Sequence, residues 1–298
     1  MGEQAPALPQ SHNKARHPDT MNTPTPPGLK GSRFELRQVD HPKLDDDDVY
    51  RLSREGRWGF IHSEEAGSAV DGPGMRVVFW TTGCEFRCTY CHNPDTWKMK
   101  NGQLTCVDDV LDELRKYGDF LRIAGGGVTI SGGEPLVQDR FVMNIIRGAN
   151  AMQLHTALDT NGFLGDRLSD AELDEIDLFL LDIKSWDPAT HQRVTGQPVE
   201  PVLAFARRLA ARKRPMWIRF VLVPGQTDDP ANIAGVAQFA ASLGNVERAE
   251  VLPFHQLGKF KWEQMGMKYE LADTPTPDAT LVEQARNHFR QAGLNCPG

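Results

Sequence analysis

The sequence has no apolar run approaching the roughly 18 residues that a helix needs to cross a bilayer. Its first 30 residues also lack the short apolar segment of a secretory signal. Basic residues are not in excess, because 33 Lys and Arg stand against 40 Asp and Glu, for a formal net charge of -7. Proteins that bind nucleic acid regardless of its sequence usually carry a basic stripe. We therefore expect neither a membrane protein nor a nucleic-acid-binding protein.

Cysteine is also scarce. The chain has five cysteines, an odd number, and three of them fall between residues 84 and 91. So few and so unevenly spaced cysteines exclude a scaffold that disulfides hold together. Their clustering instead favours a metal site in a reducing compartment, and we expect the protein to be cytoplasmic.

The N-terminal part lacks the residues for a hydrophobic core. Residues 1–30 hold six prolines and almost no aliphatic run, and residues 45–48 are four consecutive aspartates. Such a segment cannot bury enough apolar surface to offset the entropy that is lost when it becomes ordered. The sequence therefore predicts a disordered extension over residues 1–54 and one folded domain over residues 55–298.

The folded part alternates between apolar runs rich in β-formers and helical patterns. This alternation indicates βαβ units around a parallel sheet. Six such units are too few for a closed barrel of eight strands, so the predicted fold is α/β, a partial (β/α)6 barrel of the TIM type. The predicted strands cover residues 75–80, 128–131, 155–160, 178–183, 216–223 and 249–254, and the predicted helices cover residues 106–117, 141–149, 171–176, 202–212, 233–243 and 279–292.

Polar and glycine-rich segments stand where the predicted strands end. In parallel sheets ligands bind at the carboxyl edge of the strands. One site assembled from several loops explains this placement better than a set of independent turns. The segments are residues 132–135, 159–162, 182–184 and 224–225, together with His255.

The cysteine triplet follows the first predicted strand. Cys84, Cys88 and Cys91 have the spacing Cys-x3-Cys-x2-Cys, and thiolates are soft ligands that suit an iron–sulfur cluster or zinc. A closed structural zinc site needs four ligands. The further donors are poorly placed, because His92 adjoins Cys91, Cys106 begins a helix and Cys296 lies in the C-terminal tail. The spacing favours an iron–sulfur cluster with one open iron and leaves zinc as the alternative.

The triplet, with an aromatic residue before its last cysteine, resembles the radical S-adenosylmethionine superfamily. The similarity covers about residues 56–292, and the order of its motifs resembles the activating enzymes of glycyl radical enzymes, above all the branch that acts on pyruvate formate-lyase. Activators of the dehydratase type usually carry extra cysteine sets, which this chain lacks. The matching segments are residues 71–76, 90–97, 125–134, 158–162, 181–184, 217–219, 223–225 and 252–259.

This resemblance implies two cofactors and a protein substrate. A 4Fe–4S cluster would sit on the three cysteines, and S-adenosylmethionine would bind the open iron and yield a 5′-deoxyadenosyl radical. The radical would take a hydrogen atom from a glycine Cα of pyruvate formate-lyase, with flavodoxin or ferredoxin as electron donor, and we expect a monomer. Two alternatives remain: activation of another glycyl radical enzyme, such as anaerobic ribonucleotide reductase, or a zinc-stabilised binding module without catalysis.

The resemblance also implies roles for individual residues. The glycines before Glu134 allow close backbone approach, and its carboxylate is an acceptor for the methionyl ammonium group. Tyr90 would contact the adenine, in a pocket that Cys91 and His92 also line. The residues that would contact S-adenosylmethionine are Tyr90, Cys91, His92, Gly132, Gly133, Glu134, Asp182, Ile183, Lys184 and His255.

Further positions match the family more selectively. Asp159 and Asp182 match residues that hold a monovalent cation, which two converging carboxylates would need. Asp71 and His92 match residues that face the partner's glycine loop and complete the expected catalytic set with the three cysteines. Arg219 is interpreted as part of a strand-end ion pair outside the site. Residues 258–266, with Trp262, resemble a C-terminal capping segment.

Overall fold

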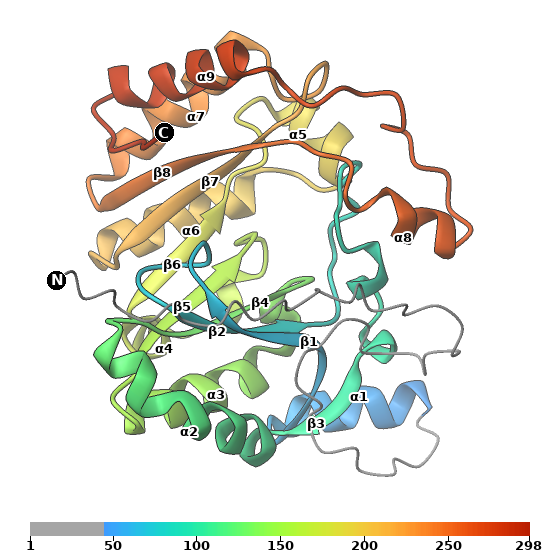
Figure 1. Ribbon diagram of the computed structural model, residues 1–298, viewed down its shortest axis with the longest axis vertical. Coiled ribbons are helices and arrows are strands. Elements are labelled where there is room, and N and C mark those ends of the chain that lie inside the picture. Colours follow the sequence, from blue (N-terminus) through green and yellow to red (C-terminus); the bar gives the residue numbers. More distant parts are fainter. Residues whose placement is uncertain (1–44) are drawn as a thin grey trace, which may run out of the picture.

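The computed structural model describes residues 45–298, which form one curved sheet with helices against its outer side (Figure 1). The sheet has eight strands in the order β3-β1-β2-β4-β5-β6-β7-β8. The six strands from β2 to β8 in this order run parallel, which confirms the predicted partial barrel. The strands are β1 Trp58–Ser68, β2 Arg76–Thr81, β3 Gln103–Cys106, β4 Gly127–Gly132, β5 His155–Thr160, β6 Leu178–Asp182, β7 Met216–Leu222 and β8 Val246–Pro253.

Strands β1 and β3 extend the sheet beyond β2 and were not expected from the sequence. β1 pairs antiparallel with β2, and β3 pairs antiparallel with β1. β1 contains the polar run Ser63, Glu64 and Glu65, which interrupts the apolar pattern of a buried strand. Glu64 is nevertheless buried, because helix α2 (Val107–Ile123) covers it.

The helices separate successive parallel strands, as the alternating pattern predicts. Most begin at a side chain that caps the first turn, such as Asp229 before α7 and Asp278 before α9. Two short helices, α5 and α8, were not predicted. Besides α2, the helices are α1 Asp46–Glu55, α3 Asp139–Ala151, α4 Asp170–Asp174, α5 Pro188–Thr195, α6 Glu200–Ala211, α7 Pro230–Leu243, α8 Lys259–Gln264 and α9 Ala279–Gln291.

The predicted disordered extension differs from the structure where the two can be compared. Residues 1–44 lie outside the described residues, but residues 46–54 belong to helix α1. The Asp45 side chain accepts a hydrogen bond from the backbone N–H of Asp48 and caps the helix. Acidic residues at a helix N-terminus are also favoured by the helix dipole. The aspartate run therefore starts a helix, which then contacts the rest of the fold through Arg140 and the Arg54 carbonyl.

Strand β7 shows how the sheet separates its two faces. Buried and partly buried residues alternate along it, with Met216, Ile218, Phe220 and Leu222 in the hydrophobic core. Since successive side chains of a strand point to opposite faces, Arg219 lies on the other, concave face. Fully burying an aromatic side chain such as Phe220 stabilises the fold by about 1.5–3 kcal/mol.

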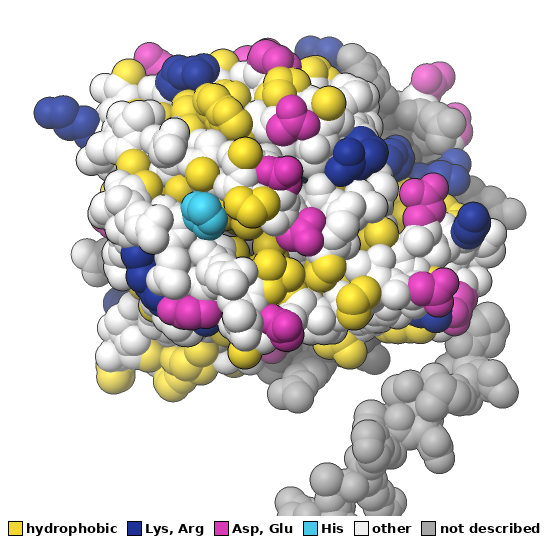
Figure 2. All heavy atoms as spheres, turned by 90° about the horizontal axis from the view of Figure 1, so that it is seen from above, with side chains coloured by type: hydrophobic (Ala, Val, Ile, Leu, Met, Phe, Trp, Pro, Cys, Tyr) yellow, Lys and Arg dark blue, Asp and Glu magenta, His cyan; other side chains and the backbone are white. Residues whose placement is uncertain are grey.

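The parallel register brings the strand ends together at one edge. Thr81 is opposite Gly132, Thr160 is opposite Leu181, and Asp182 is opposite Arg219. On the face that carries α7 and α9, acidic, basic and hydrophobic side chains lie interspersed (Figure 2). Within residues 45–298, no helix has the length and apolar character to span a membrane.

Candidate active site

The cysteine loop leaves β2 and is held on both sides. On one side, the N–H groups of Gly83 and Cys84 donate to the carbonyls of Thr96 and Trp97, at 2.7 and 3.2 Å. On the other side, the N–H group of Arg87 donates to the carbonyl of Thr195 at the end of α5, at 2.7 Å. The loop is therefore shaped by segments on either side of it in the fold.

The three thiols of this loop suit a metal cluster, which would bind them as thiolates in place of their protons. Cys84, Cys88 and Cys91 form no disulfide, and burial raises the pKa of Cys88 to about 12 and also raises the pKa values of the other two. Thiolates are therefore costly here unless a metal neutralises them. Across residues 45–298, no three His, Cys, Asp or Glu side chains converge to hold a single metal ion. In a cluster each thiolate binds a different iron, so the three thiols need not meet at one ion.

The glycines at the end of β4, Gly132 and Gly133, allow the next loop to reach the cysteines. Gly132 has φ 133°, and a Cβ atom there would lie 2.2 Å from the carbonyl oxygen of Thr81. A Cβ atom on Gly133 would lie 2.4 Å from the carbonyl oxygen of Gly83 and 3.2 Å from Cβ of Cys84. Any side chain at either position would separate the two loops, so glycine is required for their contact.

The buried Glu134 connects the loop after β4 to the end of β5 by hydrogen bonds. Its Oε1 accepts from the N–H of Leu136 at 2.9 Å and from the hydroxyl of Thr160 at 2.7 Å, and its Oε2 accepts from the N–H of Asn161 at 2.7 Å. Burial, together with the nearby Glu85, raises the pKa of Glu134 to about 8 despite these hydrogen bonds. The carboxyl group thus ties the loops after β4 and β5, and one acceptor position on Oε2 remains for a ligand.

Asn161 continues this connection to the cluster loop. Its side-chain amide lies 4.0 Å from Sγ of Cys84, at the limit of a hydrogen bond to sulfur. Asn161 belongs to the segment 159–162 that was expected at the site, but its contact with Cys84 joins residues 77 positions apart and has no local signal in the sequence. The first cysteine, Glu134 and the loop after β5 therefore form one connected group.

A second group centres on Asp159 at the end of β5. Its Oδ2 accepts from the hydroxyl of Ser131 at 2.7 Å and from Arg219 at 3.0 Å, whereas its Oδ1 is buried without a hydrogen-bond partner among the described residues. Burial raises the pKa of Asp159, the charges of Asp182 and Asp71 add to this effect, and Arg219 opposes it. An unpartnered buried carboxylate oxygen is costly and marks a position where a cation or donor would bind.

Arg219 lies at the centre of the acidic groups, although the sequence analysis leaves it outside the site. Its guanidinium lies 3.0 Å from Asp159, 3.9 Å from Asp71 and 3.7 Å from Glu250 of β8. The neighbouring Asp159 raises the pKa of Arg219, so it stays charged. The alternation along β7 could have placed this side chain on the concave face, but only the register shows which carboxylates it meets.

Asp182, Ile183 and Lys184 follow β6. Lys184 Nζ donates to Asp182 Oδ2 at 2.6 Å and lies 6.0 Å from the centre of the Tyr90 ring. Desolvation would lower the pKa of Lys184, but the attraction of Asp182, together with other nearby groups, raises it. Ile183 is buried, and its N–H donates to the carbonyl of Arg219. Asp182 and Lys184 therefore form an ion pair next to the cysteine loop.

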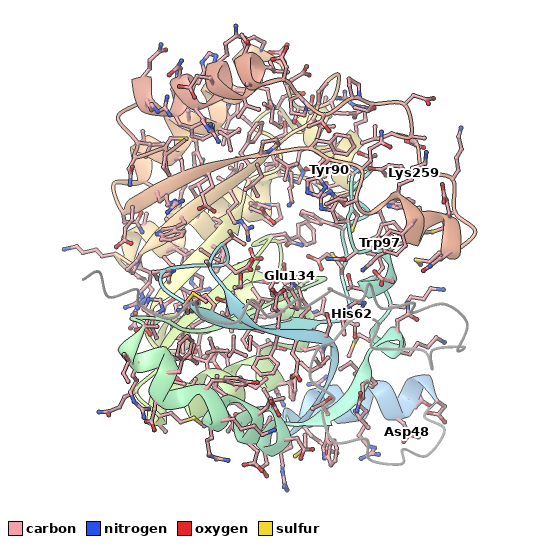
Figure 3. All side chains as sticks on the ribbon, viewed as in Figure 1. Asp48, His62, Tyr90, Trp97, Glu134 and Lys259 are labelled. Atoms are coloured by element: carbon pink, nitrogen blue, oxygen red, sulfur yellow. The ribbon has the colours of Figure 1, made fainter. Side chains whose placement is uncertain are left out.

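Tyr90 and Glu134 reach the concave side of the sheet from the loops after β2 and β4 (Figure 3). Tyr90 is 5% exposed and packs with Val194 and Phe254. Its hydroxyl is buried and has no hydrogen-bond partner in the described part of the chain. Burial raises its pKa well above the ordinary value, so it remains a neutral phenol. The hydroxyl is therefore available to a ligand.

His92 and His255 meet beside the cysteine loop. Nε2 of His92 lies 3.0 Å from the carbonyl oxygen of His255, and the two rings are 4.1 Å apart. Because a carbonyl only accepts, Nε2 of His92 carries the proton and Nδ1 is an acceptor. Burial, with the nearby His255, lowers the pKa of His92, so its ring is neutral at pH 7.

Asp71 precedes β2 in the loop that approaches the strand ends. Its side chain accepts from the hydroxyl of Ser68 at 2.6 Å, and its carbonyl accepts from the hydroxyl of Thr129 at 2.6 Å. Together with its 3.9 Å approach to Arg219, these contacts place Asp71 in the same group as Asp159. The strand edge thus brings the predicted residues into neighbouring contact groups.

Comparisons with known proteins identify the family of this chain. The sequence model of the radical SAM superfamily matches residues 78–235. Pyruvate formate-lyase-activating enzymes of Staphylococcus epidermidis and Staphylococcus aureus are each 43% identical to this chain, over 80% and 79% of its length and 96% of their own.

Among solved structures, Streptococcus suis SuiB bound to the precursor peptide SuiA matches with a TM-score of 0.56 and 17% identity, over 74% of this chain and 48% of its own. A radical SAM methyltransferase from Sphaerobacter thermophilus matches with a TM-score of 0.54 and 15% identity, over 74% of this chain and 65% of its own. These two structures support the fold alone. The sequence relatives and the superfamily match go further: this chain belongs to the radical SAM superfamily and, within it, to the pyruvate formate-lyase-activating enzymes.

Proposed function

We propose that this enzyme installs a glycyl radical on pyruvate formate-lyase. The observation that supports this most is the position of three free, partly buried thiols next to the strand-end carboxylates, in a chain 43% identical to activases of that enzyme. When bound, the 4Fe–4S cluster and S-adenosylmethionine supply an electron and a 5′-deoxyadenosyl radical that takes a hydrogen atom from a glycine Cα. Cys84, Cys88 and Cys91 would hold the cluster.

The loop Gly132–Gly133–Glu134 would receive the methionyl part of S-adenosylmethionine. The absence of side chains on both glycines brings backbone groups next to Cys84, and Glu134 keeps one acceptor position toward an ammonium group. The hydrogen bonds of Glu134 to Thr160 and Asn161 keep this loop rigid, which reduces the ordering cost of binding.

The nucleoside side of the cofactor would lie near the end of β6. Asp182 and Lys184 form a paired donor and acceptor there, the Tyr90 hydroxyl is free to bind, and Ile183 and His255 would line the same pocket. Since Tyr90, Ile183 and Phe254 are buried, this part of the site excludes water. Exclusion of water protects reactive intermediates from side reactions.

Charge supports a monovalent cation at Asp159. Four carboxylates, those of Asp71, Asp159, Asp182 and Glu250, surround Arg219, and Asp182 is already paired with Lys184. Glu250 is also paired with Arg248 at 2.9 Å, so the two remaining carboxylates, those of Asp71 and Asp159, share the single charge of Arg219. The buried Oδ1 of Asp159 has no hydrogen-bond partner among the described residues. A cation held by Asp159 and Asp182 would satisfy this oxygen and offset the repulsion.

The substrate glycine would approach between Asp71 and His92. The neutral ring of His92 offers an acceptor at Nδ1 because its Nε2 proton is held by the His255 carbonyl. Asp71 offers a carboxylate that Ser68 orients. Both groups suit the backbone of an extended peptide. From the same family resemblance we infer a cytoplasmic monomer that receives its electron from flavodoxin or ferredoxin.

The test is anaerobic reconstitution with iron and sulfide, followed by incubation with S-adenosylmethionine, a reductant and pyruvate formate-lyase. We expect electron paramagnetic resonance to detect a glycyl radical on the partner. We expect Cys88→Ser to lower deoxyadenosine production by at least about 10³-fold, because the cluster loses one of its three thiolates. Cys106→Ser, at the N-cap of α2, is the matched control and should keep full activity.

Two outcomes would contradict the proposal in different ways. Turnover that persists in Cys88→Ser would overturn the cluster assignment. Deoxyadenosine production without a radical on pyruvate formate-lyase, but with one on anaerobic ribonucleotide reductase, would retain the chemistry and change the partner.

A further inference from the structure

A polar group behind the cysteine loop has no role in the chemistry described above. Asp95 lies in the short 3-10 helix Pro94–Thr96, which follows Cys91, the third cysteine of the triplet. Its Oδ2 is 3.0 Å from Nε2 of the buried His62 of β1 and 3.0 Å from Nζ of Lys261 of α8. Lys261 comes from a segment 166 residues further along the chain. The carboxylate therefore joins three distant parts of the molecule.

Helix α8 is attached to the same segment by further contacts. Lys261 Nζ donates to Oδ1 of Asn93 at 2.7 Å, and Nε1 of Trp262 donates to the carbonyl of Cys91 at 2.9 Å. A Cβ atom on Gly258 would lie 2.6 Å from Cα of His92, so the start of α8 rests directly on the backbone beside Cys91. The helix thus covers residues 91–95.

The segment beneath α8 supports both ends of the cysteine loop. Its residues Thr96 and Trp97 accept the hydrogen bonds from Gly83 and Cys84, while Cys91 is held by Trp262. The Trp97 and Trp262 rings also pack edge to face, 5.2 Å apart. A displacement of the segment would therefore move the first and the third cysteine together.

The charges favour a fixed arrangement. Burial by itself would raise the pKa of Asp95, but the hydrogen bond from His62 and the charge of Lys261 lower it below its ordinary value. The side chains of Lys261 and Asp95 are 18% and 25% exposed, so water screens their attraction only in part. Loss of Lys261 would leave a mostly buried carboxylate with His62 as its remaining partner at this distance.

We propose that His62, Asp95 and Lys261 are positioning residues that lock the segment after Cys91 beneath α8 and so hold the cluster thiolates in place. This inference rests on the proposed function, because it assumes a cluster on the three cysteines. It predicts that the C-terminal segment controls how firmly the cluster is retained, although Lys261 touches neither the cluster nor the substrate.

The experiment measures cluster retention in the full chain without any partner protein. Wild type, Lys261→Met, Lys261→Arg and the control Lys268→Met, an exposed lysine in the same segment, are reconstituted anaerobically with iron and sulfide. The loss of visible cluster absorbance is then followed in the presence of a ferrous chelator. We expect Lys261→Met to lose the cluster about 5- to 30-fold faster. Lys261→Arg, which keeps the charge, and Lys268→Met should stay within about twofold of wild type.

The spectrum of the reduced cluster gives a second measurement. We expect the electron paramagnetic resonance signal of Lys261→Met to broaden, because the thiolates are held less uniformly, and that of Lys261→Arg to match wild type. If Lys261→Met does not fold, Asp95→Asn tests the same contact with little change in shape. The double variant Asp95→Asn/Lys261→Met should lose the cluster no faster than the more affected single variant, since both changes break one interaction.

The outcomes separate this inference from the proposed function. If Lys261→Met and Asp95→Asn retain the cluster as firmly as Lys268→Met, or if their effects add independently, the positioning role is wrong. If wild type takes up no iron and sulfide at all, the proposed function itself fails.

Discussion

Glu134 and Glu64 are both buried, and burial raises the pKa of each to about 8, yet they belong to different regions. Glu134, at the carboxyl edge of the sheet, accepts three hydrogen bonds. Glu64, in β1 beneath α2, has no hydrogen-bond partner for either carboxylate oxygen in the described residues, and Glu113 lies nearby. At the site edge the polar groups hold loops together, whereas under α2 a polar group is merely enclosed. The same raised pKa therefore accompanies two different environments, one with hydrogen-bond donors around the carboxyl group and one without.

The largest effect should come from Arg219, whose guanidinium contacts the carboxylates of Asp159, Asp71 and Glu250. Arg219→Met should lower the free energy of unfolding by about 3–5 kcal/mol, because it leaves the buried carboxylate of Asp159 and the neighbouring Asp71 without their cationic partner. Urea denaturation of the iron-free chain at pH 7 measures this change. Arg219→Lys keeps the charge and should lose less. A loss below about 1 kcal/mol in Arg219→Met would show that the ion pairs of Arg219 stabilise the fold no more than exposed ion pairs do.

A smaller loss is expected for Glu134→Gln. The amide keeps one oxygen but turns an N–H group toward backbone and hydroxyl donors, so at least one of the three hydrogen bonds is lost. We expect the free energy of unfolding to fall by about 1–3 kcal/mol in urea denaturation at pH 6. Glu64→Gln at the same pH is the control and should change it little. Equal losses in the two variants would remove the distinction between the regions.

The smallest effect, and one of opposite sign, is expected for Glu64→Gln at high pH. A carboxyl group whose pKa is raised in the folded state binds more protons when folded, so stability falls as the pH rises from about 4.5 to about 8. The variant lacks this dependence. It should match wild type at pH 5 and be more stable by about 1–2 kcal/mol at pH 9, after allowance for relaxation around the group.

Urea midpoints at pH 5, 7 and 9 test this prediction. Glu65→Gln, the next residue of β1 and an exposed one, is the matched control and should keep the wild-type pH dependence. If wild type and Glu64→Gln lose stability in parallel as the pH rises, the group responsible lies elsewhere.

Sequence-based prediction succeeded for the parallel strands and failed for β1 and α1. The six parallel strands were predicted close to their observed positions, because each contains apolar, β-favouring residues and is followed by glycine or polar residues. β1 was missed because Glu64 and Glu65 interrupt its apolar pattern, and α1 because its aspartates suggest disorder. In both cases polar residues that favour loops are placed in regular structure by neighbours distant in the chain.

For the site, prediction was strongest for position along the chain and weakest for contacts. The strand-end residues were identified as a group, but the place of Arg219 among Asp71, Asp159 and Glu250 follows from the register of β5, β7 and β8. Likewise, the family resemblance implies that Glu134 binds the methionyl ammonium group. The structure also shows that Glu134 accepts hydrogen bonds from Thr160 and Asn161. The individual roles assigned to these residues stay predictions.

The amino-acid sequence by itself determined the parallel architecture, the edge at which the site lies and the three cysteines, since periodicity and spacing are local properties of the chain. Only the tertiary structure decided which charges meet there and what holds the cysteine loop. Asp95 and Lys261 are 166 residues apart, and no local pattern encodes a contact that exists only after the C-terminal segment folds over the first loop of the barrel.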